Sequence, residues 1–135
     1  MGEDTDPFIP KHRLLLVSIG KSMERTRPRA YDAARYAWRV NLKRAENVEL
    51  VLGCNKDVVV GVYVASKWLD ASPGEATQKN FPELAAIATH KNQRWGFVGK
   101  EADDVTKKIY FGKRVPKHLT IGQAGLRYFD DLSSS

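Results

Sequence analysis

Basic and aromatic side chains gather between residues 21 and 45, where the chain reads KSMERTRPRAYDAARYAWRVNLKRA. Lys and Arg bind phosphate groups with release of counterions, and aromatic rings stack on nucleic-acid bases. Residues 11–44 carry ten Lys or Arg and two acids, whereas residues 45–135 carry twelve bases and eleven acids. The positive charge is therefore local, which predicts a surface for a polyanionic partner. The predicted phosphate contacts in this segment are Lys21, Arg25, Arg27, Arg29, Arg35, Arg39 and Lys43.

A second basic and aromatic stretch, YFGKRVPKH, occupies residues 110–118. Its predicted phosphate contacts are Lys113, Arg114 and Lys117. Gly112 would let a nucleic-acid backbone come close, because glycine has no side chain. The two basic stretches could face one partner.

Aromatic side chains are candidates for the walls of a base-binding pocket. Trp68 ends a predicted strand at the edge of a loop, Trp95 lies within another predicted strand, and Tyr110 begins the second basic stretch. The competing interpretation for each ring is core packing, because aromatic side chains bury the largest areas.

Two sequence patterns bear on nucleotide hydrolysis and nucleophilic catalysis. The segment VSIGKS ends in Gly-Lys-Ser, but Leu15 stands where a phosphate-binding loop requires its first glycine. This excludes a nucleotide-hydrolysing loop and leaves a phosphate contact through Lys21 open. Cys54 falls in a predicted turn, and we interpret it as a turn residue rather than a nucleophile.

Histidines and acids offer no pattern of a metal or acid–base site. His12, His90 and His118 lie far apart and lack the spacing of zinc ligands. The acids of EADD, residues 101–104, suit the first turn of a helix, where negative charge is favourable. The sequence therefore predicts no catalytic residue, no metal and no cofactor.

Hydrophobic periodicity places these residues on a series of short elements. Apolar runs indicate strands, and Pro28 sets the earliest start of a helix whose alanine face opposes its basic face. A hairpin is expected at CNKD, residues 54–57, with Asn55 in the left-handed conformation. Residues 69–80 read as a loop, and residues 81–90 as one short helix. The expected strands are 13–20, 48–53, 58–68, 94–99 and about 126–129, and the other expected helices are 30–45 and 101–110.

This order of elements predicts an α+β fold, with a small curved or barrel-like, mostly antiparallel sheet and two or three flanking helices. The expected organisation is a flexible acidic arm (1–12), a single domain (13–129) and a frayed tail (130–135). The 135 residues, 42% of them hydrophobic, suit one domain. No apolar run approaches the ~20 residues of a membrane span, and a lone cysteine excludes an internal disulfide. We expect a soluble, intracellular and cytoplasmic protein with no membrane partner.

The central VVVGVYV…W strand, the RWGFVG strand and the closing strand, together with the early helix, resemble the PUA-like superfamily of small pseudo-barrels. This superfamily includes the EVE, ASCH and YTH domains, and the similarity covers residues 13–129. It implies binding of RNA or DNA, with a modified base received in an aromatic-lined pocket. Trp68 and Trp95 would then wall the pocket, and Arg35, Arg39 and Lys113 would contact phosphates. The inserted segment 72–92 and the absence of a clear second half of the barrel depart from this pattern.

The leading functional prediction is a non-catalytic module that binds DNA or RNA. One alternative is an interaction domain with an acidic protein partner. A second alternative is an enzyme that acts on a nucleotide or modified base.

Overall fold

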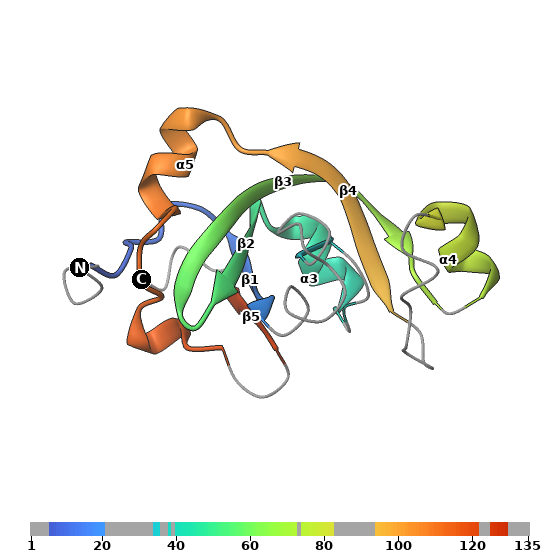
Figure 1. Cartoon of the computed structure of the whole chain (residues 1–135), viewed down its shortest axis with the longest axis horizontal. Helices are drawn as coiled ribbons and strands as arrows, with labels where there is room; N and C mark the ends of the chain where they lie inside the picture. The colour runs from blue at the N-terminus through green and yellow to red at the C-terminus, as the bar shows by residue number, and fades with distance from the viewer. Residues whose placement is uncertain are drawn as a thin grey trace.

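The computed structural model describes residues 6–20, 34–35, 38, 40–72, 74–82, 94–121 and 125–129. Within these residues, five strands form one open sheet: β1 (Leu14–Ser18), β2 (Leu50–Asn55), β3 (Val58–Asp70), β4 (Trp95–Glu101) and β5 (Leu126–Phe129). Their order in the sheet is β4-β3-β2-β1-β5, in which β1 is parallel to β2 and the other neighbours are antiparallel. The sheet curves, and helices flank it (Figure 1). The predicted α+β class with a curved, mostly antiparallel sheet is confirmed. The helices are α3 (Leu42–Asn47), α4 (Glu75–Asn80), α5 (Asp104–Tyr110) and the 3-10 helix η3 (Lys117–Leu119).

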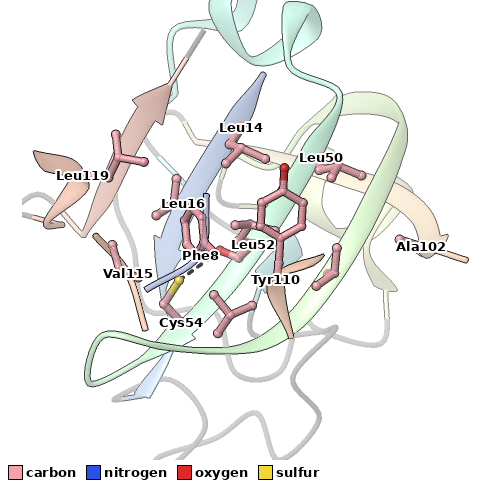
Figure 2. Close-up of a cluster of buried hydrophobic side chains, with 12 residues drawn as sticks. Phe8, Leu14, Leu16, Leu50, Leu52, Cys54, Ala102, Tyr110, Val115 and Leu119 are labelled. Carbon is pink, nitrogen blue, oxygen red and sulfur yellow. Dashed lines mark hydrogen bonds between the residues drawn. The ribbon is translucent and has the colours of Figure 1, made fainter. Parts of the chain in front are cut away.

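The sheet carries a hydrophobic core on each face. Alternate residues of β1 go to opposite sides: Leu14 and Leu16 join one core, whereas Leu15 and Val17 join the other. We call the first the arm-side core, because Phe8 of the N-terminal segment closes it together with Tyr110 of α5 (Figure 2). We call the other the α3-side core, after the helix that covers it. An uninterrupted apolar run is what a strand buried on both faces requires.

The expected helix 30–45 is wrong as a continuous element. Ala34 and Arg35 are helical, but Trp38 forms an antiparallel bridge with Trp95, with backbone N–H···O distances of 2.9 Å in both directions. Asn41 is extended and begins α3 by accepting the N–H of Arg44 on its side chain at 3.3 Å. The alanine periodicity is real, but pairing with the sheet and an asparagine cap override it.

The hairpin between β2 and β3 is confirmed, but its turn residues differ from the prediction. Asn55 pairs with Val58, so Lys56 and Asp57 are the two central residues, with φ values of 52° and 67°. Such two-residue turns need positive φ at both positions, which matches the twist of the strands. Cys54 consequently lies in β2 and is buried, not in a turn.

The segment expected to be a loop at 69–80 holds regular structure. β3 continues to Asp70, and α4 follows at residues 75–80. α4 lies beside the far end of β3 and β4, at the other end of the molecule from α5 (Figure 1). The helix expected at 81–90 falls, from residue 83 on, outside the described residues.

Part of the expected flexible arm belongs to the folded domain. Phe8 is 2% exposed in the arm-side core, and its ring meets that of Tyr110 edge-on at 5.1 Å between centroids. The Phe8 N–H donates to the carbonyl of Arg114, and the Arg114 N–H donates to that of Asp6, both at 3.0 Å. The hydrophobic contact and these backbone bonds fix residues 6–8 in place. Residues 1–5 lie outside the described part.

No helix among the described residues has the length and apolar character to cross a membrane.

Candidate nucleic-acid interface

A groove of about 490 Å³ lies between the N-terminal segment and α5. Three lysines from three parts of the chain line it: Lys11 from the segment before β1, Lys108 from α5, and Lys113 from the turn after α5. We call this the lysine groove. Its other lining residues are Pro7, Ile9 and Ile109, which are apolar, and Asp6.

The buried hydroxyl of Tyr110 positions the first lysine. The Lys11 backbone N–H donates to this hydroxyl at 2.9 Å, and Nδ1 of His12 lies 2.7 Å from it. Burial raises the pKa of Tyr110 above its ordinary value, so the phenol stays protonated at neutral pH and can hydrogen-bond to His12. A fully buried side chain of α5 thus holds the backbone at the rim of the lysine groove.

Helix α5 and its terminal turn position the other two lysines. The side chain of Asp103 caps the helix by accepting the Thr106 N–H at 2.8 Å. After Tyr110 the chain turns at Gly112, whose φ of 79° favours glycine. The carbonyl of Lys113 then accepts the N–H of Val59 at 2.9 Å, which anchors this residue to the start of β3.

The lysine groove carries a net positive charge, because its described lining holds three lysines and one acid. Neither Lys11, Lys108 nor Lys113 forms an ion pair with a carboxylate of the described residues, although Asp6 lies in the same lining. Lys107, one residue before Lys108, is instead paired with Glu101 at 2.9 Å. Three cations and three apolar side chains in one groove can hold an anionic group and a flat or aliphatic part of the same ligand.

The structure divides the predicted phosphate contacts among different environments. Lys113 lines the lysine groove, and Arg114 and Lys117 are exposed on the same segment. Lys43 is exposed on α3, which covers the opposite face of the sheet, so the two basic stretches do not form one surface through these residues. The remaining contacts predicted in the first stretch, apart from Arg35, lie outside the described residues: Lys21, Arg25, Arg27, Arg29 and Arg39.

Arg35, predicted to contact phosphates from the basic face of a helix, is buried. Its side chain is 6% exposed, and its guanidinium carbon lies 5.4 Å from the centroid of the Phe81 ring. Strand β4 lies close to the backbone of Arg35: a Cβ added to Gly96 would be only 2.6 Å from the Arg35 carbonyl oxygen. This arginine therefore packs inside the domain.

The predicted pocket aromatics do not wall a common pocket. Tyr110 is fully buried in the arm-side core, whereas Trp68 is 9% exposed and packs in the α3-side core, 5.2 Å from Phe97 between ring centroids. Trp95 is half-buried against that same α3-side core. Trp68 also borders a cavity of about 240 Å³ between α3 and an irregularity in β3 at residues 65–67.

Buried Cys54 is not activated for chemistry. Burial, reinforced by the nearby negative charge of Asp57, raises its pKa to about 12. A thiol with this pKa stays protonated at neutral pH and is a poor nucleophile. The described residues contain no group of three or more His, Cys, Asp or Glu that could hold a metal ion.

Sequence reasoning missed two of the three lysines of the groove, Lys11 and Lys108. Lys108 was explained by its place at the end of the expected helix 101–110, where a positive charge is favourable. Lys11 was assigned to the expected flexible arm before the first strand. For Lys108 the available signal was the amphipathic pattern of α5, in which Tyr110 is buried, Ile109 is half-buried and Lys108 is exposed.

Comparison with known proteins finds no family model, curated protein or solved structure that matches this chain. The resemblance to PUA-like domains therefore stays a prediction.

Proposed function

We propose that this chain is a nucleic-acid-binding module and that the lysine groove holds the phosphate backbone. The observation that carries this proposal is the convergence of Lys11, Lys108 and Lys113 on one concave surface without ion pairs to described acids. Arg114 and Lys117 are exposed on the segment that follows and would extend the positive field along the strand.

Phosphate binding of this kind has a quantitative signature in its salt dependence. With three phosphates neutralised on a single strand, the slope of log affinity against log salt is about −2. Affinity then falls by about 20-fold between ~50 and ~200 mM salt. A hydrophobic or shape-driven contact would show little of this dependence.

The triple variant Lys11→Gln, Lys108→Gln, Lys113→Gln tests the proposal. We expect its affinity for labelled DNA or RNA at low salt to fall at least about tenfold and its salt slope to flatten by about 2, because three counterion-releasing contacts are lost. Fluorescence anisotropy across a salt series measures both quantities.

A charge-matched control separates the lysine groove from the general positive charge of the protein. Lys67, Lys79 and Lys100 are exposed and do not line this groove, so changing all three to Gln removes the same charge elsewhere. Equal weakening by both triple variants would reject the groove as the phosphate site. A parent protein that binds neither DNA nor RNA at low salt would reject nucleic-acid binding and favour an acidic protein partner.

The cavity beside Trp68 has no assigned role in this function. It lies on the α3 side of the sheet, whereas the lysine groove lies on the arm side. A nucleotide held by the three lysines cannot place its base against a ring on the other face.

A further inference from the structure

The lining of the lysine groove is as apolar as it is basic. Ile9 is 68% exposed, and Pro7 is also exposed. Ile109 of α5 contributes a third apolar surface and packs on its inner side against the arm-side core. The exposed apolar side chains therefore lie among the lysines.

Resting on the proposed function, we propose that the lysine groove selects single-stranded nucleic acid, with one unpaired base against Ile9 and Ile109 and the adjoining phosphates on the lysines. A single strand presents both groups to a protein, since its bases are not enclosed in a stack of pairs. A duplex presents phosphates and groove edges. It would satisfy the lysines but leave the apolar side chains of the lysine groove in contact with water.

The size of the groove agrees with this assignment. Its volume of about 490 Å³ lies within the range of roughly 300–1,000 Å³ in which protein pockets bury small ligands. That space is large enough to take one base with its sugar. The side chains of Pro7, Ile9 and Ile109 have no hydrogen-bonding group that could read the edge of a base, so we expect weak discrimination among the four bases.

The test compares a single-stranded oligonucleotide of mixed sequence with the duplex of the same length, as both DNA and RNA, by fluorescence anisotropy. We expect the parent to bind the single strand about tenfold more tightly, since only that form uses the apolar contacts. Ile9→Gln should lower single-strand affinity about fivefold, leave duplex affinity unchanged and leave the salt slope unchanged, because it removes an apolar contact and no charge.

A matched control is available on α5. Val105 is 77% exposed and lies outside the lysine groove, so Val105→Gln makes a comparable surface change and should leave all affinities unaltered. Circular dichroism checks that both variants are folded. We expect them to be, because the side chains of Ile9 and Val105 are exposed.

The outcomes separate the two proposals. Binding of the duplex as tight as that of the single strand, with loss in the triple lysine variant, would overturn strand selection and keep the phosphate site. An Ile9→Gln variant that retains the full single-strand preference would also overturn this inference. Absence of binding to every nucleic acid at low salt would overturn the proposed function itself.

Discussion

At the scale of single residues, burial decides what a basic side chain can do. Arg35 and Lys113 both belong to basic and aromatic stretches, yet Arg35 packs over Phe81 at 6% exposure and Lys113 lines a groove. An arginine buried in this way contributes through the packing of its long stem and its contact with an aromatic face. Its charge is not available to a nucleic acid.

Arg35→Glu provides a test of this structural role. The substitution puts an unmatched negative charge beside Phe81, so we expect the free energy of unfolding to fall by about 3 kcal/mol. Urea denaturation followed by circular dichroism measures the change. Lys43→Glu, at an exposed position on α3, should change stability by no more than about 0.5 kcal/mol. Equal effects of the two variants would contradict the buried role of Arg35.

At the scale of elements, a local cap sets where α5, the helix that carries part of the site, begins. Asp103 ends one extended segment and begins α5, the helix that presents Lys108. The backbone N–H of Thr106 donates to the Asp103 carboxylate, and this bond, together with one from the Thr106 side chain, lowers the pKa of Asp103 below its ordinary value of 3.8. The deprotonated cap is therefore the form that stabilises the helix.

Substitution of Asp103 should reveal this cap through its pH dependence. A carboxyl group whose pKa is lower in the folded state stabilises that state at pH values above its pKa in the unfolded state. This contribution is lost as the pH falls through its pKa in the folded state. We therefore expect Asp103→Ala to be less stable than the parent at neutral pH, with a difference that narrows below pH 3.8. Urea unfolding at several pH values measures this difference.

The neutral cap Asp103→Asn serves as the matched variant. Asparagine accepts the same hydrogen bond without a charge, so this variant should keep most of the stability at neutral pH and show no pH-dependent loss from this position. A difference between Asp103→Ala and the parent that stays constant with pH would show that the charge of the cap has no stabilising effect.

At the scale of the whole molecule, the N-terminal segment completes both the arm-side core and the lysine groove. Phe8 fills the arm-side core over β1 and β2 (Figure 2). Lys11, three residues later, lines the lysine groove. The stability of the fold and the shape of the site therefore depend on the same segment.

Phe8→Ala tests this dependence. Truncating a side chain that is 2% exposed leaves a cavity against Tyr110, and we expect the free energy of unfolding to fall by about 3–5 kcal/mol. The neighbouring variant Ile9→Ala, at 68% exposure, should cost no more than about 0.5 kcal/mol. Denaturant titration of the two proteins makes the comparison. Equal stabilities would place the segment outside the cooperative fold.

Patterns within short windows of sequence were enough to predict most elements. The apolar run before Gly20, the two β-rich runs around residues 54–57, the RWGFVG strand and the acidic start of α5 all appear in the structure near their expected places. These predictions succeed because alternation, capping and turn preferences act between residues close in the chain. They fail where tertiary pairing overrides them, as at Trp38, whose backbone bonds to β4 where a helix was expected.

The site, in contrast, was decided by packing between distant parts of the chain. Lys11 and Lys113 are 102 positions apart in the sequence. The docking of the N-terminal segment beside the turn after α5 brings them into one groove. Trp68 and Tyr110 go to opposite faces of the sheet for the same reason. The sequence by itself determined the elements and the local excess of positive charge. The tertiary structure decided which charges are exposed and which of them meet, because burial depends on contacts that no local pattern specifies.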